Sequence, residues 1–359
     1  MQLTKQEQQA IFDAKAGASV NIAQLTMDAP VIPLKMTAGG PPLLLSDDPE
    51  YIRLPQAGAM RETLRPGIFR LYSYHVNAIK GQQTRITNVI ENLGDKPMTV
   101  RLLRQAFPKP DNEYNLVGCE GLKQYWTSTP EEQGRIVAPG QSIAIDPKME
   151  NTLISYDDLS HGFYEIFIDQ PARITTLQTT SDKSGPDANK QIHELQPIPA
   201  ENNNAGRGFF PFSEYEVTTP DAYVMDTANG AVQIVIADGI TDRWITGWSS
   251  DLDKPTILAG NYGVMYNMTI QRKHSDGRAW ALITWNQRAE DQWCGGIAMA
   301  IMVNGELITI PSDCVKIGHA PQASVIKVFE PSEEPIKLVF SPPGASCLPI
   351  PLIFVPIEK

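Results

Sequence analysis

Apolar and polar positions alternate in short runs along most of the chain, which is the pattern of strands with one solvent-facing side. The run Gly67–Glu91 shows the plan: an apolar segment, a loop at Gly81, and an alternating segment. A cluster of turn-forming residues follows at Asn92–Pro97. Strands at this close spacing predict an antiparallel sheet, in which Gly67–Glu91 folds as a hairpin.

The second half of the chain repeats this plan at Gly263–Asn286. Gly67 and Gly263 each open a strand, and Gly81 and Gly277 each follow fourteen residues later. We therefore expect two sandwiches of one type, as a pseudo-repeat. Residues 5–16 have the composition of a short helix, and residues 114–126 are expected to form a helix or an irregular crossing.

The predicted fold is all-β, with two antiparallel β-sandwich domains and an extended N-terminal arm. Prolines in Ala29–Leu34 and Gly39–Pro42 exclude a helix from the second half of the arm. Such an apolar arm either packs on its own domain or adds a strand to a neighbouring copy. The predicted boundaries are residues 1–45 for the arm, 46–180 for the first sandwich, 181–208 for a polar linker and 209–359 for the second sandwich.

Composition and charge narrow the classes of function. The 359 residues include 29 prolines and 26 glycines, which favours many short strands over long helices. A net charge of −11 without a dense basic run argues against a nucleic-acid partner. No apolar run approaches the length of a membrane span. The chain opens on a polar segment, which leaves a cytosolic protein or a secreted one whose leader has been removed.

The cysteines bear on the compartment. Cys294, Cys314 and Cys347 lie near the C-terminal end, and Cys119 lies apart from them. One disulfide among the last three is expected in an oxidising compartment, and four buried thiols are the alternative.

Metal ligands are sparse. The five histidines form no HxH or HExxH pattern, so the spacing does not predict copper or zinc. His161 follows Asp157 and Asp158, and this trio has the right chemistry to hold a metal. Asp251 and Asp253 resemble a calcium loop but lack its glycine and its downstream glutamate. A polar loop without metal is the simpler interpretation of both groups.

Five tryptophans fall within a short stretch of the second half. Exposed indole rings on a sandwich stack on the apolar faces of sugar rings, whereas buried ones fill a core. The candidates for carbohydrate binding are Trp244, Trp248 and Trp293, and the other two tryptophans of the stretch are Trp280 and Trp285.

Six segments of strand and turn residues carry a resemblance to known proteins: Arg70–Asn77, Val89–Val100, Asp111–Gly118, Val137–Ile143, Ala259–Ile270 and Phe340–Ile350. They resemble a family of bacterial surface proteins of unassigned activity, labelled copper amine oxidase N-terminal-domain or stalk-domain proteins. The resemblance covers about residues 50–355 and implies a secreted or envelope-associated β-sandwich protein without an assigned chemistry. The oxidase label does not transfer, because the chain has no tyrosine-quinone motif and no cluster of three histidines with ligand spacing.

These observations predict a non-catalytic structural or interaction protein of the cell surface or extracellular space. Its partners would be further copies of itself, joined through the N-terminal arm by strand addition, or a cell-envelope glycan. A carbohydrate-binding protein is the alternative. A hydrolase on a β scaffold is the third candidate, although serine nucleophile elbows, phosphate loops and paired-carboxylate motifs are not recognisable. No cofactor is expected, apart from calcium at the loops above.

Overall fold

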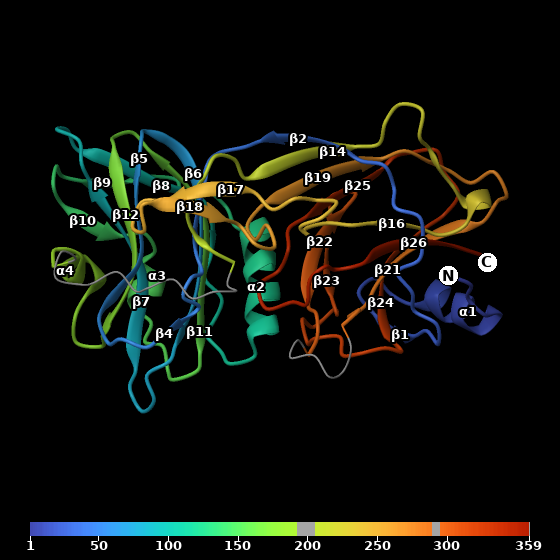
Figure 1. Ribbon diagram of the computed structural model, residues 1–359, viewed down its shortest axis with the longest axis horizontal. Helices are drawn as coiled ribbons and strands as arrows, with labels where there is room; N and C mark the ends of the chain where they lie inside the picture. The colour runs from blue at the N-terminus through green and yellow to red at the C-terminus, as the bar shows by residue number, and fades with distance from the viewer. Residues whose placement is uncertain (192–204, 289–294, 359) are drawn as a thin grey trace. The chain divides into compact units, whose positions relative to one another are not determined.

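The computed structural model describes residues 1–191, 205–288 and 295–358 (Figure 1). Strands dominate, so the predicted all-β sandwich fold is confirmed. The chain divides into two compact units. We call Gly40–Ser213 together with Trp244–Gly263 the central unit, and Met1–Gly39, Glu214–Arg243 and Val264–Lys359 the terminal unit.

The units differ from the predicted domain boundaries in three places. Residues 1–39 of the expected arm belong to the terminal unit, but Leu43–Ser46 is an inner strand of the central unit. Trp244–Gly263, expected in the second sandwich, belongs to the central unit. The expected linker 181–208 contributes a helix and the first residues of a strand to the central unit, and its residues 192–204 lie outside the described residues. The partners of a strand in a sheet depend on how side chains pack between neighbouring strands. The order of the strands along the sequence does not reveal those partners.

Two sheets form the central unit. The smaller one has the order β10-β7-β12-β5, and the larger one runs β18-β17-β13-β3-β6-β11-β8-β9, with β4 also paired to β6. Its described residues also form three helices, α2 (Tyr114–Thr127), α3 (Pro147–Glu150) and α4 (Gly185–Asn189). The strands are β3 (Leu43–Ser46), β4 (Tyr51–Ile52), β5 (Ala57–Leu64), β6 (Gly67–Asn77), β7 (Thr84–Asn92), β8 (Met98–Ala106), β9 (Arg135–Val137), β10 (Ser142–Ala144), β11 (Leu159–Ile168), β12 (Ala172–Thr180), β13 (Arg207–Phe210), β17 (Thr246–Ser249) and β18 (Lys254–Ile257).

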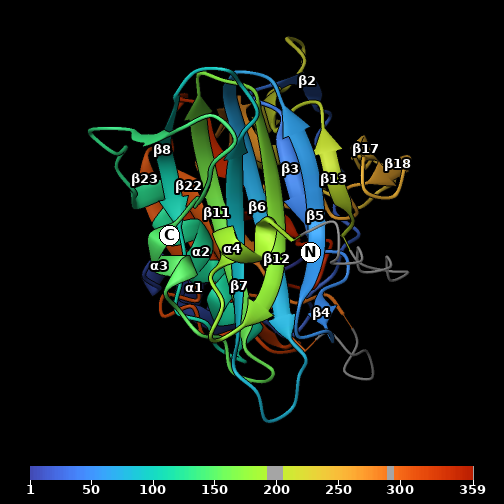
Figure 2. The same ribbon diagram turned by 90° about the vertical axis from the view of Figure 1, so that its left-hand side faces the viewer.

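The eight strands from β5 to β12 have the topology of a jelly roll. One sheet takes the first, eighth, third and sixth of them (β5-β12-β7-β10), and the other takes the second, seventh, fourth and fifth (β6-β11-β8-β9). This order arises when two Greek keys fold over each other and bury the faces between the sheets. Beyond β6, the second sheet is widened by β3, β13, β17 and β18, which Figure 2 shows on one side of the unit.

The terminal unit has the same strand order. Its sheets run β1-β24-β21-β26-β16 and β2-β14-β19-β25-β22-β23, with a separate pair of β15 and β20. Two copies of one sandwich would share such an order, and a common origin of the halves stays a prediction. The elements are α1 (Lys5–Asp13), β1 (Ser19–Asn21), β2 (Lys35–Gly39), β14 (Glu214–Thr218), β15 (Met225–Asp226), a 3₁₀ turn (Thr227–Asn229), β16 (Val232–Ile234), β19 (Met265–Ile270), β20 (Arg272–Lys273), β21 (Ala279–Thr284), β22 (Met299–Val303), β23 (Glu306–Ile310), β24 (Gln322–Phe329), β25 (Ile336–Phe340) and β26 (Leu352–Ile357).

The predicted hairpin at Gly67–Glu91 is wrong. Both strands exist, but β6 pairs with β3, β4 and β11, whereas β7 pairs with β10 and β12 in the other sheet. The connection between them therefore crosses from sheet to sheet. The crossing explains why nearly every residue of β6 is buried, which one strand of a surface hairpin would not be. The equivalent strands β19 and β21 also lie in different sheets.

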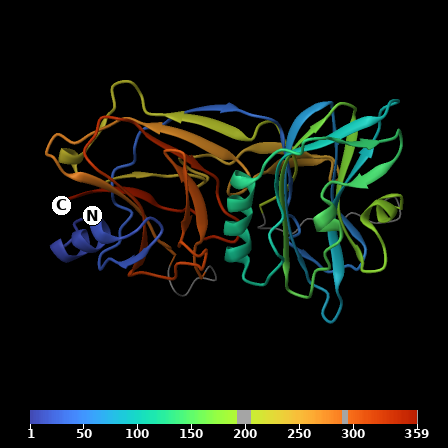
Figure 3. The same cartoon turned by 180° about the vertical axis from the view of Figure 1, so that it is seen from behind.

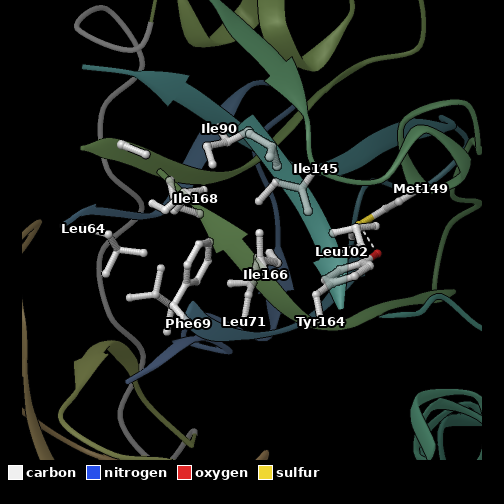
Figure 4. Packing of buried hydrophobic residues seen from close by; sticks show 14 of the residues in the cluster. Leu64, Phe69, Leu71, Ile90, Leu102, Ile145, Met149, Tyr164, Ile166 and Ile168 are labelled. Carbon is white, nitrogen blue, oxygen red and sulfur yellow. Dashed lines mark hydrogen bonds between the residues drawn. The ribbon is translucent and has the colours of Figure 1, made fainter. Parts of the chain in front are cut away.

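The core of the central unit lies between its two sheets. Leu71, Tyr164 and Ile166 project from the larger sheet toward Ile90 and other residues of the smaller one (Figure 4). Met149 of α3 closes the cluster beside the Tyr164 ring, and the Tyr164 hydroxyl donates to Asp146 Oδ2 at 3.0 Å. The sequence places these residues at alternate positions, so one face of each strand is apolar.

The N-terminal arm packs within its own chain in this structure. Ile11 of α1 joins the core of the terminal unit, β1 pairs with β24, and β2 pairs with β14. The helix lies near the C-terminal end (Figure 3), where Gln8 Oε1 accepts the Glu358 N–H at 2.8 Å. Exchange of the arm between copies would form these same pairings with a neighbouring chain, and self-assembly stays a prediction.

Candidate functional site

The tryptophans separate into buried and exposed groups. Trp280 and Trp285 belong to the core of the terminal unit, as the interpretation of core filling predicts. Trp244 and Trp248, both in the central unit, are 40% and 44% exposed. Trp293 lies outside the described residues. Two of the three predicted carbohydrate-binding residues are therefore at the surface.

A cavity of about 520 Å³ opens beside Trp248, and all of its lining residues are in the central unit. Phe69, Phe209 and Trp248 give it aromatic walls, and Glu62 and Arg65 bring charge to it. Its lining comes from edge strand β5, the start of β6, and the added strands β13 and β17. The full lining is residues 62–69 with Pro42, Phe209, Trp248 and Ser250.

Close backbone contacts hold Trp248 at this cavity. Strand β17 meets β13 at the pair Phe209–Trp248. A Cβ on Gly208 would lie 2.4 Å from the Trp248 carbonyl oxygen, and one on Gly247 would lie 2.2 Å from the Phe209 carbonyl oxygen. Only glycine permits so close an approach at both positions. The two glycines therefore determine that the Phe209 and Trp248 rings line the same cavity.

Glu62 is an acid on the apolar face of its strand. Met60 and Leu64, two residues to either side, are core residues, so Glu62 also points inward. Both carboxylate oxygens accept hydrogen bonds from Ser250, from its N–H at 2.7 Å and from its hydroxyl. Burial raises the pKa of Glu62, and the hydrogen bonds from Ser250 oppose that rise. The two hydrogen bonds between Glu62 and Ser250 hold the turn after β17 against strand β5.

Asp251 and Asp253 lie at the turn between β17 and β18. Asp251 is half-buried, and burial raises its pKa against the opposing effect of the Arg207 charge and the Arg61 N–H. Asp253 is exposed and adopts a positive φ of 48°, as expected in the tight turn between β17 and β18. Turn geometry accounts for the backbone of Asp253 and the neighbouring arginines for the environment of Asp251, and a calcium site here stays a prediction.

His161 is not brought together with Asp157 and Asp158. It is buried in β11 among aromatic rings, and its Nδ1 lies 3.0 Å from the Ser73 carbonyl oxygen. Asp157 instead accepts a hydrogen bond from the Tyr114 hydroxyl at 3.1 Å. Within residues 1–191, 205–288 and 295–358, no three His, Cys, Asp or Glu side chains are arranged to hold a metal ion.

The three cysteines that the structure describes are disulfide-bonded. Cys314 and Cys347 are both disulfide-bonded, and so is Cys119, which the sequence analysis left outside the expected bridge. Cys294 lies outside the described residues. The alternative of buried free thiols does not hold for the three described cysteines.

Sequence reasoning missed Glu62, Ser250 and Phe209. A signal for Glu62 was present, because a charge between Met60 and Leu64 interrupts the apolar face of an alternating strand. Such an inward charge on an edge strand usually has a structural or binding purpose. Its partner Ser250 comes 188 residues later, and no local pattern connects the two.

Comparisons with known proteins add little. No family model matches the chain, and no curated protein matches it. A solved structure of oxalate decarboxylase from Bacillus subtilis aligns with 89% of this chain and 76% of its own at 12% identity, with a TM-score of 0.11. A score this low carries no argument about fold or function. The resemblance to stalk-domain proteins accordingly stays a prediction.

Proposed function

We propose that the protein is a non-catalytic binding protein of the cell surface or extracellular space, and that it holds a carbohydrate in the cavity of the central unit. One observation carries the proposal: an exposed tryptophan, Trp248, forms the wall of a cavity that also contains a buried carboxylate. The cavity volume of about 520 Å³ lies in the range of small-molecule sites.

The chemistry of the lining suits a sugar. The indole face of Trp248 offers a flat apolar surface to the C–H face of a pyranose ring. At the polar end, each Glu62 oxygen keeps lone pairs beyond the hydrogen bond that it accepts from Ser250, so it is able to accept from a sugar hydroxyl. Arg65 supplies exposed donors. The same site thus contacts both the apolar and the polar parts of a sugar.

Binding is favoured over hydrolysis by the acids at the cavity. Glycoside hydrolysis generally uses a pair of carboxyl groups across the scissile bond. Among the residues that line the cavity, all of them described, Glu62 is the single carboxylic acid, and Ser250 engages both of its oxygens. This arrangement supports a role in holding a ligand.

The oxidised cysteines support the proposed compartment. Disulfides persist in secreted and envelope proteins and are rare in the cytosol of most organisms. The extracellular alternative is favoured over the cytoplasmic one because all three described cysteines, Cys119, Cys314 and Cys347, are disulfide-bonded. No helix among the described residues has the length and apolar character of a membrane span.

Replacing Trp248 with alanine tests the proposal. We expect the intact protein to bind a glycan on an array, and the variant to bind it roughly tenfold to a hundredfold more weakly, because a buried aromatic contact is worth about 1.5–3 kcal/mol. Calorimetric titration with the best glycan measures the change.

Trp244→Ala is the matched control for Trp248→Ala. Trp244 is similarly exposed but does not line the cavity, so its removal is expected to leave the affinity unchanged. A silent array with the intact protein, or equal losses in the two variants, would contradict the proposal.

A further inference from the structure

The β17–β18 ribbon has one apolar, exposed face. Residues directly opposite in an antiparallel pair share a face, and so do residues two apart along a strand. The pairs Trp248–Pro255 and Thr246–Ile257 therefore place four side chains on one side of the ribbon. All four are exposed, with Ile257 at 53%. We call these four residues the ribbon strip.

The ribbon strip is continuous with the aromatic wall of the cavity. Trp248 belongs to both, and Phe209, which lines the cavity, lies opposite Trp248 on the neighbouring strand. The distance across β13, β17 and β18 is about 10 Å, from two strand spacings. Lys254 occupies the other face of the ribbon. The path from the cavity to the last strand is therefore apolar and uncharged.

The outer edge of the ribbon is poorly suited to an added strand. Pro255 has no N–H, so the pairs Trp248–Pro255 and Thr246–Ile257 are the ones that exchange no hydrogen bonds, and their backbone groups point away from the partner strand. On β18, the last strand of the sheet, the donor is missing at Pro255. The Ile257 carbonyl oxygen lies against Gly206, 2.3 Å from the position that a Cβ on this glycine would take, so it is not open to an added strand either. An extended peptide gains its affinity at an edge from main-chain hydrogen bonds. The ribbon thus favours a ligand that lies on its face.

We infer that the ligand is a linear, uncharged glycan chain, with one sugar in the cavity beside Glu62 and the following sugars laid across Trp248, Pro255 and Ile257. A chain of flat rings presents alternating C–H faces and hydroxyl edges, which suits an apolar strip that ends at a polar cavity. This inference rests on the proposed function and adds the length and the charge of the ligand.

Chain length is the variable that tests it. Calorimetry would compare sugars of one to six units from the glycan that binds best on the array. The intact protein is expected to bind the longer members roughly tenfold more tightly than the shortest, because only they cover the ribbon strip. Ile257→Ser is expected to remove this gain and to leave the affinity for the shortest sugar unchanged.

Lys254→Ala, on the same strand but the opposite face, is the control and should retain the full gain with length. Equal affinity at every length, or equal weakening of short and long sugars by Ile257→Ser, would overturn the inference while leaving the proposed function intact. A protein that binds no sugar at any length would overturn both. Two further results would assign the ribbon strip to another occupant and overturn the inference: Ile257-dependent binding of an extended apolar peptide without glycan binding, or Ile257-dependent dimerisation in light scattering.

Discussion

Replacing Arg70 with methionine is expected to lower the free energy of unfolding by about 3–5 kcal/mol, because it leaves a carboxylate without its buried partner. The Arg70 side chain is 2% exposed, and its Nη2 donates to Glu165 Oε2 at 2.9 Å. Its other nitrogens donate to the Tyr125 hydroxyl and to the carbonyl oxygens of Ser213 and Gly263. Methionine fills similar space but donates to none of them. Urea unfolding measures the loss.

Arg173→Met is the matched control for Arg70→Met. Arg173 pairs with Glu91 at 3.4 Å, but the two side chains are 29% and 22% exposed, and such pairs contribute about 1 kcal/mol or less. Adding Glu165→Leu to Arg70→Met should recover part of the stability, since the uncompensated charge is then gone. Similar losses for Arg70→Met and Arg173→Met would show that the Arg70 network does not stabilise the central unit.

Acidification is expected to destabilise the protein through His161. Burial lowers the pKa of His161 to about 4, against a usual 6.5, and the Ser73 carbonyl that accepts its Nδ1–H opposes the shift. Because the folded-state pKa lies below the unfolded one, the unfolded chain binds more protons, and stability falls as the pH drops through this window. Between pH 7.5 and 5 the loss from this residue is about 2 kcal/mol.

Comparing the wild type with His161→Gln isolates this contribution. Glutamine stays neutral, so the wild type should lose about 2 kcal/mol relative to the variant between pH 7.5 and 5, by urea unfolding at each pH. Asp47, whose pKa is raised by burial, acts in the opposite direction, but it is present in both proteins and cancels. A constant difference between wild type and His161→Gln would contradict the assignment.

Strand positions followed from the sequence, whereas strand partners did not. The alternation in Gly67–Glu91 located β6 and β7 correctly, because side-chain period is a local property. Whether two successive strands pair or cross between sheets depends on which other strands pair with their edges. Those partners are β3 and β11 for β6 and β12 for β7, and they lie at some distance along the chain.

The candidate site was likewise predictable only in part from the sequence. Trp248 was predicted from residue type alone, since indole rings suit sugar faces wherever they are exposed. Exposure itself was not predictable: Trp280 and Trp248 have the same side chain, and only their positions in their sheets make one buried and the other accessible. The cavity needed Phe209, Trp248 and strand β5 together, from three separate segments.

The path of the chain has a consequence for synthesis on the ribosome. The polypeptide passes from one unit to the other four times, at residues 39, 213, 243 and 263. The central unit is not complete until residue 263 has left the exit tunnel, and the first 39 residues must wait for the last strand of the chain. N-terminal-first folding, the usual order for multidomain proteins, is therefore unavailable to this protein. The shortest continuous fragment that contains the whole central unit is residues 40–263. It necessarily includes thirty residues, 214–243, that belong to the terminal unit.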